Sequence, residues 1–518
     1  MSTAKRLISG TVASWASILV TMLTQVALVP IFLTYWDIKT YGIWIAIQAL
    51  VNVLSTLDRG HNDFLEYEFL KLGPEHRPKI AFNLWSGIRI AAIVSFIELL
   101  LVYLLSMHID MNFLFGEDSS DSLNLRSEIG WAIVIQWIGW SLTNLLGLFF
   151  RALSAFGYYP RMGWWNVLLA MVTSFIPVLF VINGANLLQA SAGAIGGVVV
   201  LLGFQLADIL RLLRKEGIAS GDYSFKQGFQ NFGVSMTLSG RYFLDNFKQQ
   251  GVRLLMAPLT GAAGVAAFST IRTVANVTQQ GLLTVTHPLL PELMRFLREK
   301  NQQKMEVSFG TVWFVLIGLL APGVLILQCI APALFSVWTK GQIEFDPILL
   351  AALSTGVLFF ALAQPAMAVT VGNNLLKVQI LISFISSLVV VGGILLLVPY
   401  LHILGAGIAL LMAEIVAAIG FLHYAKIWLK ENGLIWPAKA SGIATASVYI
   451  AALSMSLMIV FPQYQWASLI IGLLLLCLNI WRYWNSLSLQ INDRIQSMLA
   501  RLPIINKLLG KSKPLSQS

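Results

Sequence analysis

Long apolar segments recur along almost the whole chain of 518 residues. A run of roughly 17–25 mainly apolar residues is what a helix needs to cross a bilayer, and the chain offers about fourteen such runs. Only 11% of its residues are charged, whereas soluble globular domains carry about 25%. The pattern predicts an all-α integral membrane protein of about fourteen transmembrane helices, without a large soluble domain.

The predicted helices fall into two halves with short connections. We expect membrane spans at residues 8–34, 41–59, 80–107, 129–150, 162–183, 188–213, 231–256, 263–289, 306–330, 348–372, 377–400, 402–426, 438–461 and 466–484. A short internal repeat aligns Ile45–Val53 with Ser269–Val277, and each segment lies in the second helix of its half. The repeat predicts two six-helix lobes, residues 1–215 and 225–430, followed by two more helices at 438–484.

The basic residues gather on one side of the predicted membrane. With the N-terminus in the cytoplasm, only Lys39, Arg126 and Lys340 of the 34 Lys and Arg residues fall outside. Cytoplasmic loops are enriched in Lys and Arg, so both termini are expected to be cytoplasmic. Residues 485–518 are expected to form a basic amphipathic tail on the inner leaflet. The net charge of +10 does not indicate nucleic-acid binding, because it is spread over short loops.

Charged residues also lie at membrane depth between residues 239 and 279. They are Arg241, Asp245, Lys248, Arg253 and Arg272. A charge at the bilayer centre costs roughly 2.5–3.5 kcal/mol on insertion scales, so such residues usually line a polar cavity, pair, or meet a charged ligand. On a regular helix Arg241, Asp245 and Lys248 share one stripe. Because the basic residues outnumber the acid, we expect a cationic substrate-binding cavity.

Further polar residues are assigned to the same cavity. Those on its wall are Gln48, Asn52, Asn276 and Gln279. Arg89, near the cytoplasmic end of the predicted third helix, is assigned to the cavity entry. Two alternatives stay open, since Asn and Gln also hydrogen-bond between packed helices, and Arg89 or Arg253 can extend toward the headgroups.

Two acidic residues stand alone at depth in the predicted spans. Glu98 lies in the third helix and Glu414 in the twelfth. A carboxyl group in hydrocarbon favours a bound proton or a counter-cation, so both are candidates for coupling transport to H⁺ or Na⁺. Asp58, at the predicted end of the second helix, is expected to be an interfacial cap or a partner of Arg59.

No motif for covalent chemistry is present. The chain has no phosphate-binding loop of the Walker type, and its six histidines are scattered without metal-ligand spacing. Cys329 and Cys477 both fall inside apolar spans, where cysteine behaves as a small hydrophobic residue. We therefore expect a transporter rather than an enzyme, with no metal and no organic cofactor.

Three short motifs resemble those of a known group of transporters. Helix two begins with a YG-x-W pattern at Tyr41, Gly42 and Trp44, and ends with Leu-Asp-Arg-Gly at residues 57–60. The predicted eighth helix ends in the proline-punctuated segment His287–Glu292. Together with charged residues in helix seven, these features resemble the multidrug/oligosaccharidyl-lipid/polysaccharide exporter superfamily. The chain is most similar to its Wzx-type polysaccharide flippases, which commonly carry an apolar residue where Arg59 stands.

The resemblance implies a function and a location. It implies alternating access around a central cavity in the plasma (inner) membrane of a bacterium. The expected substrate is an oligosaccharide linked to undecaprenyl diphosphate, moved from the inner to the outer leaflet for a surface polysaccharide such as lipopolysaccharide. Membrane lipids and other polysaccharide-assembly proteins are the expected partners. A multidrug or cation antiporter and a peptidoglycan-precursor flippase stay open as alternatives, and a membrane glycosyltransferase or polymerase as one from another class.

Overall fold

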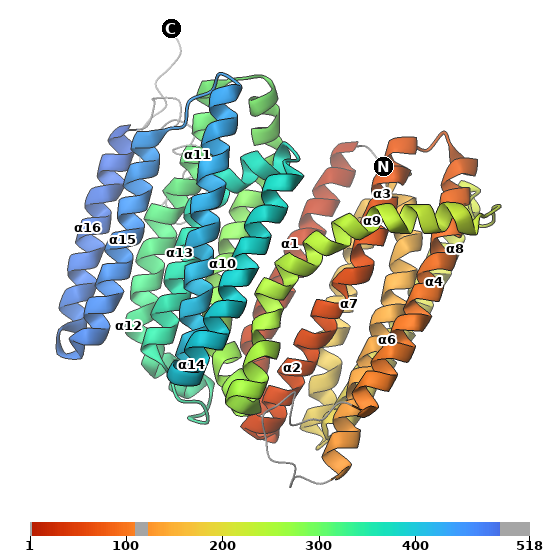
Figure 1. Ribbon diagram of the computed structural model, residues 1–518, viewed down its shortest axis with the longest axis horizontal. Helices are drawn as coiled ribbons and strands as arrows, with labels where there is room; N and C mark the ends of the chain where they lie inside the picture. The colour runs from red at the N-terminus through yellow and green to blue at the C-terminus, as the bar shows by residue number, and fades with distance from the viewer. Residues whose placement is uncertain (1–2, 109–122, 487–518) are drawn as a thin grey trace. The chain divides into compact units, whose positions relative to one another are not determined.

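The computed structural model describes residues 3–108 and 123–486, and in this part of the chain all regular structure is helical (Figure 1). The first half holds α1 (Thr3–Tyr35), α2 (Ile38–Leu54), α3 (Thr56–Leu72), α4 (Arg77–His108), α6 (Leu123–Ser154), α7 (Tyr159–Ile182) and α8 (Leu187–Glu216). The second holds α9 (Phe225–Asn246), α10 (Val252–Arg298), α11 (Gln302–Val315), the π-helical segment η2 (Leu316–Leu320), α12 (Ala321–Trp338), α13 (Pro347–Gly372), α14 (Leu376–Glu431), α15 (Ala438–Val460) and α16 (Gln465–Ser486). Most of the proposed tail lies outside the described residues.

The predicted number of membrane passes is confirmed. Among the described residues, eleven helical stretches, or twelve with the bent pair α2–α3 counted as one, are long and apolar enough to cross a membrane. Two of these stretches contain a break with non-helical backbone, at Gly261 in α10 and at His402 in α14. Splitting both stretches raises the twelve to fourteen, and the breaks fall at the predicted boundaries between spans.

Two predicted helix ends are wrong. The second span was expected to stop at residue 59, but it bends by 44° after α2 and continues as α3 to Leu72. The eighth span was expected to end at the prolines of residues 287–292, but α10 runs on to Arg298. Membrane helices tolerate proline because neighbouring groups satisfy the freed backbone carbonyl, so the proline signal overestimated the break.

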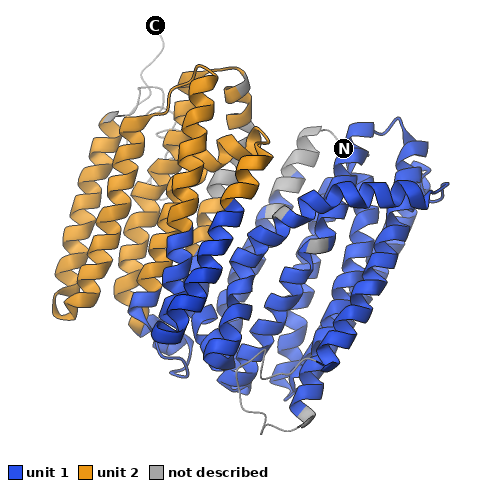
Figure 2. Cartoon of the chain, in the orientation of Figure 1, with its two compact units in different colours: residues 1–277, 333–349, 383–413 blue, residues 278–332, 350–382, 414–518 orange. Residues whose placement is uncertain are grey.

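By contacts the described chain separates into two compact units (Figure 2). Unit 1 comprises residues 1–277, 333–349 and 383–413, and unit 2 comprises 278–332, 350–382 and 414–518. The division into lobes at 1–215 and 225–430 stays a prediction.

Helices α3, α4, α6 and α9 pack together in unit 1. Helix α9 lies across α3 and α4, as Figure 1 shows. Its inner face carries small residues, and a side chain at Gly60 of α3 would collide with Ser239 of α9. Such close approach of small residues is a common way to pack helices in lipid, where burying apolar surface contributes little. This packing places α9 and the residues after it beside α2 and α3.

Ion pairs join helices within unit 1. Arg151 of α6 pairs with Asp63 and also with Glu66 of α3, the latter at 2.6 Å, and the three side chains are largely buried. Arg161 of α7 pairs with Asp208 of α8. The paired charges satisfy one another at helix ends and hold neighbouring helices in register.

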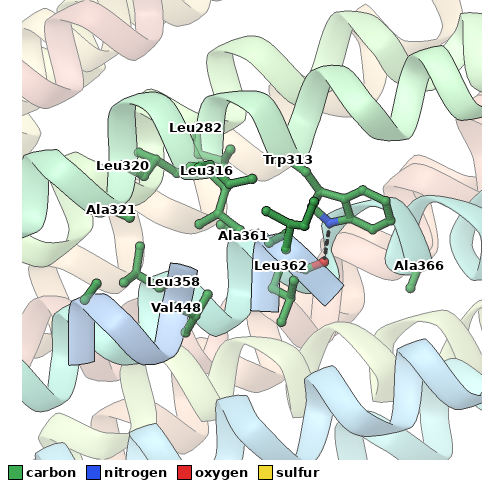
Figure 3. Close-up of a cluster of buried hydrophobic side chains, with 14 of the residues drawn as sticks. Leu282, Trp313, Leu316, Leu320, Ala321, Leu358, Ala361, Leu362, Ala366 and Val448 are labelled. Carbon is green, nitrogen blue, oxygen red and sulfur yellow. Dashed lines mark hydrogen bonds between the residues drawn. The ribbon is translucent and has the colours of Figure 1, made fainter. Parts of the chain in front are cut away.

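Unit 2 has its own apolar core, in which α15 and α16 take part. The indole nitrogen of Trp313 on α11 donates to the carbonyl oxygen of Leu362 on α13 at 3.1 Å, and apolar side chains surround this bond (Figure 3). The Tyr483 hydroxyl of α16 donates to the carbonyl oxygen of Gly310 at 2.9 Å. A backbone carbonyl oxygen has two lone pairs, so it can accept a side-chain donor in addition to a helical bond. These polar contacts join α11 to α13 and to α16.

Candidate functional site

The predicted cationic region contains a break in helix geometry. Between α9 and α10 the backbone forms a π-helix over Phe247–Gly251, which includes Lys248. A π-helical turn holds more residues than an α-turn and is frequent at functional sites. The expected stripe through Arg241, Asp245 and Lys248 assumed an uninterrupted α-helix, so it does not continue through this segment. Lys248 is half-buried there.

Arg272 is fixed to the π-helical segment. Its guanidinium donates to the backbone oxygen of Gln249 at 2.6 Å and to the side-chain Oε1 of Gln249 at 2.7 Å, and only 6% of the residue is exposed. The flat fork of donors matches two acceptors on one residue, which a lysine cannot do. Both of these acceptors are neutral oxygens, so the two bonds orient the guanidinium without neutralising it. The prediction that Arg272 lies at depth beside the helix-seven charges is consistent with this geometry.

Asp245 and its neighbour are also held by hydrogen bonds. Asp245 accepts from the Ser383 hydroxyl of α14 at 2.5 Å, and Asn246 donates to the carbonyl oxygen of Asn52 on α2 at 2.7 Å. Ser387 donates to the carbonyl oxygen of Leu244 at 3.2 Å. The end of α9 therefore contacts α2 and a segment of α14, all within unit 1.

Arg253 lies just past the π-helical segment. Its Nη1 donates to Oε1 of Gln250 at 2.7 Å, and its Nε is buried without a hydrogen-bond partner among the described residues. Tyr41, 7% exposed, lies close enough to interact electrostatically with this guanidinium. An arginine bonded locally with one donor still free can bind an anion, so substrate contact by Arg253 stays a prediction.

Arg89 is bound by aromatic rings. Its guanidinium lies 3.5 Å from the ring centroid of Tyr223, in the loop between α8 and α9, and donates to the carbonyl oxygen of Trp85 at 3.0 Å. Stacking of this kind stabilises a cation at a protein surface. The structure thus gives Arg89 a local packing role, and its part in substrate entry stays a prediction.

The remaining predicted residues are spread along the same helices. Gln48 and Asn276 are half-buried, Asn52 is exposed, and Gln279 is half-buried on the part of α10 that belongs to unit 2. The side chain of Arg241 lies outside the described part of the structure. Their membership of one cavity stays a prediction.

The two predicted coupling acids have different surroundings. Glu414 is half-buried on α14 at the boundary of unit 2. Glu98 of α4 lies against Asp58 of α3. The expectation that Asp58 is an interfacial cap is wrong, since the residue is 5% exposed, and Arg59 pairs instead with Asp63 at 3.9 Å.

Some of these contacts were not found from the sequence. Gln249, Ser383 and Tyr223 are the partners of Arg272, Asp245 and Arg89, and nothing in their own residue types marks them out. Two signals were available in the sequence, the paired glutamines at 249–250 among charged residues and the acid in the Leu-Asp-Arg-Gly motif.

The arrangement offers cationic groups at membrane depth. Guanidinium and ammonium groups on η1 (Phe247–Gly251) and α10 can form short, charge-assisted bonds with phosphate or carboxylate oxygens. No group of three or more His, Cys, Asp or Glu side chains that could hold a metal ion occurs in the described part of the chain. The chemistry of the site is therefore binding of an anion.

Comparison with known proteins gives a fold. No family model matches the chain, and no curated protein matches it. Among solved structures, the lipid II flippase MurJ in an inward-closed conformation has a TM-score of 0.66 at 12% identity over 93% of this chain and 99% of that one. An inward-facing multidrug-resistance MATE transporter of the MOP superfamily has a TM-score of 0.64 at 13% identity over 82% and 99%. This chain has their fold.

A third structure has the same arrangement. A mutant of the Vibrio cholerae MATE transporter VcmN has a TM-score of 0.57 at 16% identity over 83% of this chain and 97% of that one. The expected fold class is confirmed by these flippase and transporter structures. Their low identity to this chain leaves its substrate to be argued from its own residues.

Proposed function

We propose that the protein is a flippase that moves a polyprenyl-diphosphate-linked oligosaccharide from the inner to the outer leaflet of a bacterial plasma membrane. The observation that carries the proposal is the set of basic side chains at membrane depth around the π-helical segment: Lys248, Arg253 and Arg272. In unit 1 these residues meet one nearby acid, Asp245, which already accepts from Ser383.

The chemistry of such a substrate fits this charge. A diphosphate cannot cross hydrocarbon without groups that replace its hydration, whereas its lipid tail can stay in the bilayer. Arginine and lysine supply strong hydrogen bonds to phosphate oxygens, and arginine can do so with two parallel donors. The half-buried Lys248 and the free Nε of Arg253 are positioned to contribute here.

The extent of the structural match also supports a flippase. MurJ, named as a lipid II flippase, matches 93% of the chain, whereas the two MATE transporters match 82% and 83%. An organic cation would favour a cavity rich in Asp and Glu, and the described residues around the π-helical segment do not provide one. A multidrug antiporter is therefore the weaker alternative.

The proposal is tested by lipid analysis of cells with and without the gene. Polyprenyl-diphosphate oligosaccharides would be extracted and identified by mass spectrometry, together with surface glycan. We expect a completed oligosaccharide on its carrier to accumulate without the protein, and surface glycan to be lost. Accumulation of a disaccharide–peptide precursor would indicate peptidoglycan-precursor transport instead, and unchanged lipids would reject the proposal.

Variants link the result to the site. Lys248→Ala and Arg272→Ala should fail to restore surface glycan in the deletion strain, because each removes one cation that would hold the diphosphate. Arg211→Ala is the matched control, since Arg211 is an exposed residue on α8 away from these groups. Membrane abundance of every variant would be measured by immunoblot. Full complementation by both cavity variants would contradict the assignment of the site.

A further inference from the structure

Two buried carboxyl groups meet inside unit 1. Asp58 near the start of α3 and Glu98 in the second half of α4 lie close enough for their carboxyl groups to interact, with the indole of Trp140 on α6 beside Asp58. Asp58 is 5% exposed. All three helices pack against one another, so the pair lies at a three-helix junction rather than in a loop. The sequence placed these two acids in different spans and gave no reason to pair them.

The contact is chemically incomplete as two carboxylates. Oδ2 of Asp58 and Oε2 of Glu98 are both buried and have no hydrogen-bond partner among the described residues. An ionised carboxylate only accepts hydrogen bonds, so two of them in contact repel, whereas one protonated carboxyl donates to the other. In a membrane interior the repulsion is large because the local dielectric is low. One proton shared by the pair removes the conflict.

Nearby charges do not supply the missing balance. The charged or titratable groups on the surrounding helices are Arg59, His61 and Asp63 on α3, Arg89 on α4, Arg151 on α6 and Asp245 on α9. Most of them have partners of their own. Arg59 and Arg151 pair with Asp63, and Arg89 stacks on Tyr223. Nε2 of His61 lies 3.4 Å from the carbonyl oxygen of Gly87. In the described structure none of these bases forms an ion pair with Asp58 or Glu98.

A metal cation fits the pair less well than a proton. Hard cations such as Ca²⁺ take six to eight oxygen ligands, and the described residues here provide two carboxyl groups and one indole N–H. The N–H is a donor, which repels a cation and favours an acceptor oxygen. The donor beside Asp58 therefore favours Asp58 as the ionised member, with the proton on Glu98.

We propose that Asp58 and Glu98 form a proton-binding site that holds one proton between them and acts as the coupling site of transport. Loss of the proton would place two negative charges together between α3 and α4 and push these helices apart. The coupling role rests on the proposed function, whereas proton binding by the pair does not. The site lies in unit 1, the unit that also holds the cationic residues around the π-helical segment.

Carbodiimide labelling tests proton binding directly. Dicyclohexylcarbodiimide is apolar and reacts with protonated carboxyl groups in membranes. The carboxylic acid adds across one C=N bond, and the adduct rearranges to a stable N-acylurea whose mass is that of the acid plus the reagent. Neighbours of Glu98 on α4, such as Ile97 and Leu101, are exposed on the outer surface of the helix, so the reagent can approach from lipid.

The expected result is a label on one of the two residues in the full-length protein in lipid. Tandem mass spectrometry should find it on Glu98, with labelling lost as the buffer is made alkaline and absent in Glu98→Gln. The exposed Glu75 serves as the internal control for a carboxyl in water and should stay unlabelled. Asp58→Asn, which keeps the shape of the pair, should retain a label on Glu98 that no longer depends on pH over the same range.

Two outcomes would overturn the proposal. One is the absence of label on both Asp58 and Glu98 at every pH at which the protein stays folded. The other is protection of the pair by Na⁺ at constant pH, which would make it a sodium site. If labelling behaves as expected but the lipid analysis of the deletion strain shows no change, the proton site stands and the flippase function fails. If the lipids accumulate but the label is absent, the reverse holds.

Discussion

Single residues fix the closest approaches in unit 1. Gly42 of α2 passes directly beside the backbone of Ala262 on α10, so a Cβ at this position would collide with the Ala262 carbonyl oxygen. Ala262 is fully buried and lies next to the break at Gly261, whose φ of 69° suits glycine. The contact explains why glycine stands in the YG-x-W motif that the sequence analysis singled out.

At the residue scale we predict that Gly42→Ala destabilises the protein. Overfilling a packed contact against backbone costs about 1–3 kcal/mol, because neither chain can move aside easily. Thermal unfolding in detergent should show a lower midpoint than that of the wild type. Gly196→Ala on α8 is the matched control, since no atom lies within 4 Å of the position of its Cβ. An unchanged midpoint for Gly42→Ala would show that α2 and α10 can separate at this contact.

At the scale of elements, the π-helical segment sets which way the charges face. It inserts extra residues between α9 and α10, and thereby turns Gln249 toward Arg272 and Gln250 toward Arg253. Helix-forming propensity does not distinguish such a segment from an α-helix. It is visible only in the hydrogen-bond pattern of the folded chain.

We predict that deleting Gln250 abolishes transport without preventing insertion. The deletion removes one residue from the π-helical segment and lets an α-helix continue, which turns Lys248 and everything before it relative to Arg272. Surface-glycan complementation should be lost, while membrane abundance on an immunoblot stays near that of the wild type. The control is Gln250→Ala, which keeps the segment length. Restored glycan in the deletion variant would mean that the register of α9 is not important.

At the scale of the whole molecule, the two C-terminal helices belong to the core of unit 2. Besides the Tyr483 bond to Gly310, the Asn479 side chain of α16 donates to the Ser447 hydroxyl of α15 at 3.0 Å. Val448 and Met455 of α15 are fully buried in the same apolar cluster as Trp313. Helices α15 and α16 are thus part of the packing and not an appendage.

A chain that ends before Ala438 should fail to fold properly. Removing α15 and α16 exposes the apolar cluster around Trp313 and leaves the Gly310 carbonyl without its tyrosine donor. Size-exclusion chromatography of a fluorescent fusion should show aggregation of this truncated chain. A chain that ends after Ser486 keeps these contacts and should elute as a single symmetric peak. Monodisperse elution of the shorter chain would show that unit 2 folds without these helices.

The sequence by itself determined the number of membrane passes, their approximate limits and the presence of charge at depth. These properties are local, because crossing the bilayer requires a continuous apolar run and each charge inside one is visible where it stands. The resemblance to the exporter superfamily named the same kind of fold that the MurJ and MATE structures later showed.

Only the tertiary structure decided which charges meet. Asp58 and Glu98 come from different helices, Ser383 reaches Asp245 across 138 positions of sequence, and the π-helical segment turns Gln249 to Arg272. A hydropathy pattern states how deep a side chain lies but not in which direction it points or what faces it. That depends on helix packing, on bends such as the 44° turn between α2 and α3, and on register changes inside a helix, which only the folded chain contains.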